Sequence, residues 1–351
     1  MAWLHFREGH AGAPQARATL RVREPAASVS GSAIAARPVT PRARLAAAES
    51  QLFGAAGEAC ALPPLADMGS AGSDPAARQS VEGTPAFKDF AASLHRIDDT
   101  LRSSSEPYAN AVALWLNVPR NDRDEGAVPE AERRRQLAAL AVRTTDPRIY
   151  AMAFLTCRGS SDNGCHALNA RRWAQLDAGN AMPWLYLLDD AVKGGDVSSQ
   201  EEALFQMAAS TRMDDRTYAP VPTIAGAAGA SAGELMAADA LSETAVGIAA
   251  AQLQPIGTLA RVCKPAPLPD ANRAQHCSRI ADLLFDHSDT PMLRMMGAGM
   301  TRRVTGNAAR VELVSREIDR MTEPAEPGAT SCDRLRERMK LWTRMARRPA
   351  S

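Results

Sequence analysis

The sequence predicts an all-α fold, and three observations carry that prediction. Apolar residues recur at spacings of three and four, the period of one face of an α-helix, through most of the chain from Thr84 to Arg348. Prolines and N-capping residues stand directly before many of these stretches, where they favour helix starts. Strand-like alternation of apolar and polar residues is nearly absent. We therefore expect antiparallel helical hairpins that stack side by side, as in an α-solenoid.

Composition divides the chain into three parts. Residues 1–80 are rich in Ala, Pro, Gly, Ser and Arg without sustained periodicity, which predicts a disordered tail or an incorrectly assigned start. Helical hairpins are expected over 84–213 and a helical C-terminal part over 230–348. The intervening 214–229 is rich in proline, glycine and alanine, and we expect its two prolines to prevent a regular helix.

Helix starts are marked most clearly in the first helical part. Helices are expected over about 84–101, 107–118, 129–141 and 147–157. Asp146 directly before Pro147 reads as an N-cap followed by proline at the first helical position. The polar loop that opens at Gly159 ends that last helix.

The centre of the chain predicts two hairpins. The first pairs the helix that begins at Pro147 with a second helix from about Cys165, closed by turn residues that end at Asn180. The second pairs a helix built around Trp184, ended by Gly194-Gly195, with a helix that reaches Thr211.

Two spacings in this central stretch match a known repeat. Trp184-x2-Leu187 is followed by Ala203-x3-Met207, and Tyr150 precedes Trp184 by 34 residues in the same phase. Residues 146–211 therefore resemble a degenerate tetratricopeptide repeat, whose period is 34 residues. The resemblance implies a stacked helical scaffold whose usual role is to bind other proteins, and no functional residue carries over from it.

The C-terminal part continues the helical pattern. Ser231 with Glu234 predicts a capping box before a long helix that reaches Leu253. Further helices are expected over about 270–285, 291–304, 307–321 and 331–348.

The six cysteines include two pairs that are close in the sequence. Cys157 and Cys165 lie at the bend of one predicted hairpin, and Cys263 and Cys277 flank a proline-rich loop between two helices. Both arrangements suit the short Cα separation of a disulfide, so we expect both bonds. Free thiols and metal or redox roles remain alternatives, and the pairing of Cys60 and Cys332, the two cysteines outside these pairs, is left open.

One polar cluster is the only concentration of acids and histidines in the sequence. Asp282 and Asp286 share a helix face, and the whole cluster consists of His276, Asp282, Asp286, His287 and Asp289. A hydrolytic or metal-dependent site is one interpretation. Because the spacing matches no known ligand pattern, ordinary helix capping is the favoured one.

Two further groups of residues contain side chains that can bind metals, but interpretations without a metal are favoured for both. Cys157, Cys165 and His166 lack a fourth ligand for zinc, so the disulfide is favoured. Met292, Met295, Met296 and Met300 have the side chains of a soft-metal or peptide groove, but at helical spacing core packing is favoured. No cofactor is expected.

Charge and hydropathy limit the partners. The 351-residue chain has a formal net charge of +1, which does not favour nucleic acid. The absence of any run of 18 apolar residues predicts no transmembrane segment. The disulfides favour the periplasm or secretion, although no signal peptide is visible, and a reduced cytoplasmic protein is the alternative.

The prediction for function is a non-enzymatic helical-repeat scaffold that binds protein or peptide partners. The hairpin pattern and the lack of a catalytic motif favour it. The alternative is an enzyme with a site near Asp282 to Asp289.

Overall fold

The computed structural model describes residues 85–119, 128–229, 231–264, 271–306, 308–322 and 331–347. Within these ranges every regular element is a helix, and β pairing is limited to two isolated bridges, Asn180 with Arg212 and Met213 with Ser288. The predicted all-α fold is therefore confirmed. The predicted tail, Cys60 and the side chain of Cys332 lie outside the described residues.

The first helices begin close to where the sequence predicts them. They are α4 (Pro85–Ser103), α5 (Pro107–Leu116), α6 (Glu130–Arg143) and α7 (Pro147–Cys157). The side chain of Asp146 caps α7 by accepting a hydrogen bond of 2.8 Å from the backbone N–H of Arg148. Asn117 ends α5 in the left-handed region, with a φ of 49°, and its side chain pairs with both backbone polar groups of Val128.

The chain after α7 differs from the prediction. The sequence predicts one helix from about Cys165, but the structure has a 3-10 helix, η2 (Asn163–Ala167), and then α8 (Ala170–Leu176). Asn169 separates them because its side chain caps α8, accepting from the backbone N–H of Arg172. The next pair is α9 (Met182–Gly194) and α10 (Val197–Ala209), and Gly195, at a φ of 69°, makes the turn between them.

A short helix, α11 (Val221–Ala227), occupies the stretch where no regular helix is predicted. Pro220 is its N-cap and Pro222 lies in its first turn, where a missing N–H leaves no hydrogen bond unmade. That prediction is wrong because both prolines stand at the start of the helix rather than in its interior.

The remaining helices follow the predicted order, except that a short helix, α13 (Ile256–Val262), stands where only a turn is predicted after Pro255. The others are α12 (Ala232–Ala251), α14 (Ala271–Asp286), α15 (Pro291–Thr305), α16 (Ala309–Thr322) and α17 (Ser331–Arg347). The capping box predicted at the start of α12 is present, with the side chains of Ser231 and Glu234 each accepting from the other residue's backbone N–H.

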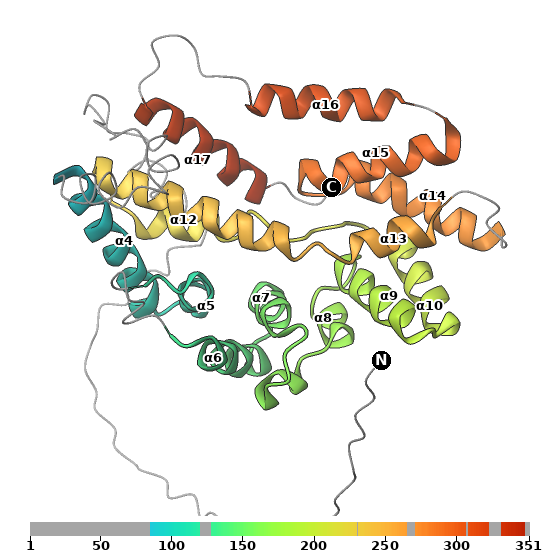
Figure 1. Cartoon of the computed structure of the whole chain (residues 1–351), viewed down its shortest axis with the longest axis horizontal. Coiled ribbons are helices and arrows are strands. Elements are labelled where there is room, and N and C mark those ends of the chain that lie inside the picture. Colours follow the sequence, from blue (N-terminus) through green and yellow to red (C-terminus); the bar gives the residue numbers. More distant parts are fainter. Residues whose placement is uncertain are drawn as a thin grey trace, which may run out of the picture. The chain divides into compact units, whose positions relative to one another are not determined.

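Helices that are distant in the sequence pack against one another. The long α12 lies beside α4 and α17 (Figure 1). It also contacts α11, and α14 contacts α10 as well as α15. One cluster of buried apolar side chains runs from Ile97 to Met339. In a solenoid each unit contacts only its neighbours, so these contacts do not confirm the solenoid-like stacking, and the tetratricopeptide resemblance stays a prediction.

Candidate functional site

The polar cluster predicted in and after α14 is divided among separate contacts. Asp282 and Asp286 are exposed and both pair with Arg310 of α16, at N–O distances of 2.5 and 3.4 Å. His276 packs edge-on against the ring of Phe205 on α10. In the described part of the chain, no group of three or more His, Cys, Asp and Glu residues is placed to hold a metal ion.

The other two members of that cluster lie in the turn after α14. The backbone carbonyl of His287 accepts from the N–H of Met213, at 2.9 Å. A carboxylate oxygen of Asp289 accepts from the backbone N–H of Asp215, at 3.2 Å. This turn is therefore hydrogen-bonded to the segment that follows α10, at Met213 and Asp215.

Asp215 is a buried acid that the sequence analysis missed. Its carboxylate accepts from the backbone N–H of Thr217 at 2.9 Å and from the hydroxyl of Thr290 at 3.4 Å. Burial raises the pKa of Asp215 to about 6. Burial, together with the neighbouring charges of Asp215 and Asp214, also raises the pKa of Asp289. The adjacent acids Asp214-Asp215, directly before an arginine, were the available sequence signal.

A second buried acid, Asp177, ties the same segment to the loop before α9. The guanidinium groups of Arg212 and Arg216 both pair with it, and Arg216 also pairs with Asp214 at 2.7 Å. Burial opposes the ionisation of Asp177. The contacts of this carboxylate with Arg216, Asn180 and Arg212 outweigh burial, so the pKa of Asp177 is lowered. The segment from Arg212 to Thr217 thus joins two loops through charge pairs, which is a structural role.

The two predicted disulfides are present. Cys157 is bonded to Cys165, with the Cα atoms 5.3 Å apart, and Cys263 to Cys277, with the Cα atoms 5.5 Å apart. Because the first bond uses both thiols, it removes them as zinc ligands. No cysteine among the described residues is free.

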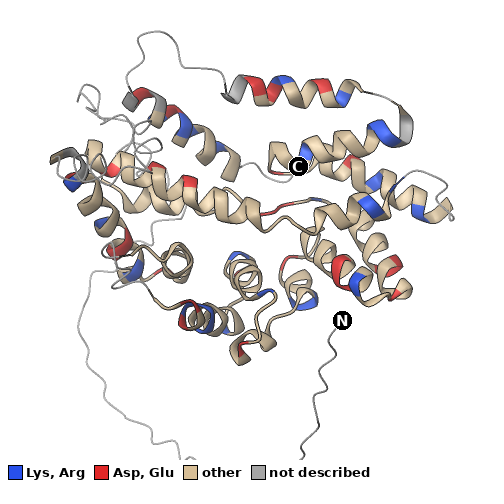
Figure 2. Cartoon of the chain, viewed as in Figure 1, with Lys and Arg blue, Asp and Glu red and all other residues tan. Residues whose placement is uncertain are grey.

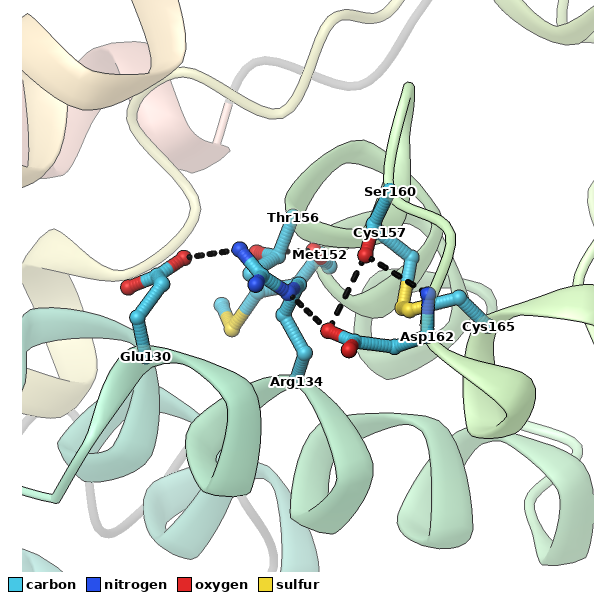
Figure 3. The surroundings of a disulfide bond; sticks show 8 residues. All are labelled: Glu130, Arg134, Met152, Thr156, Cys157, Ser160, Asp162 and Cys165. Carbon is cyan, nitrogen blue, oxygen red and sulfur yellow. Dashed lines mark hydrogen bonds and ion pairs between the residues drawn. A yellow bond between two sulfur atoms is a disulfide. The ribbon is translucent and has the colours of Figure 1, made fainter.

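The loop closed by the first disulfide is also held to α6. Arg134 donates to the carboxylate of Asp162 at 2.5 Å, and Asp162 accepts from the hydroxyl of Ser160 at 3.0 Å (Figure 3). These contacts lower the pKa of Asp162, with Arg134 as the largest cause. The loop between Cys157 and Cys165 is therefore fixed by both covalent and ionic contacts.

Residues of α8, α9 and α10 line an open groove. Its volume is about 380 Å³, at the lower end of the range for ligand sites. Its apolar part is made by Trp184, Leu187, Ala191 and Ala203, together with the backbone at Gly194. We call this the Trp184 groove. The three helices that form it lie close together in Figure 1.

Polar side chains line the rest of the Trp184 groove. They are Arg171 from α8, Asp190 from α9, Asp196 from the turn between α9 and α10, and Ser199 and Glu202 from α10. Arg171 and Glu202 join α8 to α10 by two parallel hydrogen bonds of 3.0 and 2.8 Å. Elsewhere, acidic and basic residues are interspersed along the described helices (Figure 2). We call the apolar lining residues the floor of the groove and the polar ones its rim. Apolar surface combined with a few polar groups can position an extended peptide or a single side chain.

Trp184, around which the sequence predicts this helix, and Leu187 both pack against the main cluster of buried apolar side chains. Both are only partly buried, whereas Leu185, Tyr186 and Leu188 are almost completely buried. The reason is that α9 packs against α8, α10 and α13, so more than one of its faces is covered. A tryptophan three residues before a leucine, with Ala191 and Gly194 farther along the same face, was the signal for a groove.

The methionines of α15 are mainly packing residues. Met300 is buried, and Met295 and Met296 pack against the apolar clusters, while Met292 is about half exposed. Core packing, the favoured interpretation, describes three of the four.

None of the helices in the described ranges combines the length and apolar character that a bilayer span requires. Comparison of the chain with protein-family models, with curated proteins and with solved structures finds no match. Its function must therefore be argued from its own side chains.

Proposed function

We propose that this protein is a non-enzymatic helical scaffold that binds a peptide segment of a protein partner in the Trp184 groove. The observation that carries the proposal is the partial exposure of Trp184 and Leu187 at the floor of a cavity of about 380 Å³. Tryptophan is among the residues that most often dominate the energy of protein interfaces. A cavity of this size accommodates a short stretch of an extended chain rather than a folded domain.

The hairpin of α9 and α10 supports this role because it holds the groove in a fixed shape. Asp196 caps α10 through the N–H and the hydroxyl of Ser199, at 3.0 and 2.6 Å. The phenol of Tyr186 donates to the carbonyl of Gln252 at 2.9 Å, which ties α9 to the end of α12. A preformed site binds with less loss of conformational entropy.

The proposal places the protein in an oxidising compartment, either the periplasm or the exterior of the cell. The two disulfides support this location, because such bonds persist where thiols are not kept reduced. Alkylation of thiols in intact cells followed by mass analysis tests it. Full alkylation of Cys157, Cys165, Cys263 and Cys277 without reductant would reject it.

Selection of displayed peptides tests the binding role. Peptides are selected on the wild-type protein alone, and their affinities for the wild type and for the Trp184→Ala variant are then measured. We expect the selected peptides to bind the variant about 30-fold more weakly, the loss expected of a central interface residue. Phe205→Ala is the matched control, since Phe205 is 54% exposed on α10 but does not line the groove. Equal binding to all three proteins would reject the groove as the site.

A further inference from the structure

The rim of the Trp184 groove is acidic. Its lining includes three carboxylates, those of Asp190, Asp196 and Glu202, and one cation, Arg171, and Arg158 pairs with Asp190 from outside the lining, so the formal charge is −2 for the lining and −1 with Arg158 counted. By contrast, the whole chain has a formal charge of only +1. The groove therefore has a local charge that a cationic ligand would complement.

At least two of these carboxylates carry their charge at neutral pH. Hydrogen bonds from Ser199 lower the pKa of Asp196, and hydrogen bonds from Arg171 lower that of Glu202. The third, Asp190, pairs with Arg158 at 2.7 Å and is 55% exposed. All three thus have partners, but each lies where part of its surface remains open to a ligand.

The cation already at the rim is weakly held. Arg171 is 55% exposed and Glu202 is 42% exposed. An ion pair so open to solvent contributes little to stability, because water screens it and two long side chains must be ordered. An incoming guanidinium can therefore take the place of Arg171 beside Glu202.

The floor of the groove selects the same class of ligand. A tryptophan ring attracts a cation placed over its face, and it does so more strongly than the other aromatic side chains. Arginine suits such a place better than lysine because its flat guanidinium is more weakly hydrated and stacks on rings. The structure already contains this kind of contact, since the guanidinium of Arg158 lies 4.9 Å from the centre of the Tyr186 ring.

We infer that the peptide bound in the Trp184 groove presents an arginine side chain, which lies against Trp184 within the rim formed by Asp190, Asp196 and Glu202. This inference rests on the proposed function and adds the chemistry of the partner. The partner is then a protein with an exposed, arginine-bearing segment.

Calorimetric titration with defined peptides tests the inference. The probes are acetyl-(Gly-Ser-Arg)3-amide and the same peptide with glutamine or lysine in place of arginine. We expect the arginine peptide to bind about tenfold more tightly than the glutamine peptide, with the lysine peptide between them. Raising the salt concentration should weaken the binding of the arginine peptide, because the rim is open to solvent.

Two neighbouring glutamates provide a matched pair of variants. Glu202 lines the groove and pairs with Arg171, whereas Glu201 faces α14 and pairs with Arg273. Glu202→Gln should weaken the binding of the arginine peptide several-fold, and Glu201→Gln should leave its affinity unchanged. Equal losses in both variants would overturn the inference, since they would show attraction to overall charge alone.

Variants of Trp184 separate the two proposals. Trp184→Phe keeps a ring and should retain most of the affinity that Trp184→Ala loses, with circular dichroism to show that both variants fold. If the glutamine peptide binds as tightly as the arginine peptide, or if displayed peptides that depend on Trp184 lack arginine, the arginine inference fails while the binding role stands. If no displayed or defined peptide depends on Trp184, both fail.

Discussion

Arg158, the residue after Cys157, donates a hydrogen bond of 2.7 Å to the buried carboxylate of Asp189 on α9. Lys193 and the hydroxyl of Thr258 donate to the same carboxylate, each at 2.7 Å. Burial opposes the ionisation of Asp189, but these three hydrogen bonds outweigh it and lower its pKa. One carboxylate thus joins the end of α7, the middle of α9 and the start of α13.

Removing the charge of Asp189 should destabilise the fold. We expect Asp189→Asn to lower the free energy of unfolding by about 2 kcal/mol. Breaking a fully buried ion pair costs more than this, but here Arg158 and Lys193 are partly exposed and water can solvate their charges once the carboxylate is gone. Urea unfolding measures the change. The control is Asp190→Asn, whose side chain is 55% exposed and which should cost less than about 1 kcal/mol. Equal effects would contradict the central role of Asp189.

Asp215 should make stability depend on pH in a definite direction. Because burial raises its pKa from 3.8 to about 6, the folded protein retains a proton that the unfolded chain releases between these values. The contribution of Asp215 is therefore most favourable below pH 4, and it is lost as the pH rises through about 6.

The variant Asp215→Asn, which cannot ionise, isolates that contribution. Its stability relative to the wild type should increase as the pH rises from 4 to 7, as measured by urea unfolding at each pH. Because the charge of Asp215 helps to raise the pKa of Asp289, the difference between the two proteins includes the change at Asp289, which acts in the same direction. A difference between the two proteins that does not vary with pH would show that Asp215 ionises normally.

Gly297 lies where α15 packs closely against α14. A Cβ atom there would lie 2.6 Å from the backbone nitrogen of Phe285 and 2.7 Å from the carbonyl oxygen of Ala281. Gly297→Ala should therefore force the two helices apart and cost about 1 to 3 kcal/mol.

Gly299 is the control on the same helix. A Cβ atom at Gly299 would meet no neighbouring atom within 4 Å, so Gly299→Ala should stabilise the protein by up to about 1 kcal/mol through helix propensity. Thermal unfolding of the two variants should shift in opposite directions. A shift of both in the same direction would argue against the close packing of α14 and α15.

The disulfide that closes the longer loop should contribute slightly more to stability, because the entropy of closure grows with the logarithm of loop length. The sequence separations are 8 residues for Cys157–Cys165 and 14 for Cys263–Cys277. In the chain-entropy description these loops correspond to about 2.5 and 3 kcal/mol. Replacing each pair by serine and measuring urea unfolding tests this expectation, and variants as stable as the wild type would contradict it.

Several elements could be predicted from the sequence because local residue chemistry determines them. The cap at Asp146, the capping box at Ser231, the turn at Gly195 and the two disulfides all depend on residues near in the chain. The helix α11 was not predicted, because its prolines become acceptable only once the helix starts beside them.

The candidate site could not be predicted, because it depends on packing between distant segments. The partial exposure of Trp184 follows from how α9 contacts α8, α10 and α13, which periodicity along one helix does not reveal. Likewise, the buried position of Asp215 depends on a turn 74 residues later, at Asp289. Asp282 and Asp286 share a face as predicted, but Arg310 on another helix determines their partner.

The bond between Cys263 and Cys277 has a practical consequence for limited proteolysis. A protease that cleaves the chain anywhere between these two residues produces fragments that remain covalently joined. On a non-reducing gel the cleaved protein would migrate as a single species of nearly full mass, and only reductant would separate the pieces. Digestion of this protein should therefore be followed on reducing gels, or cleavage at that position will be overlooked.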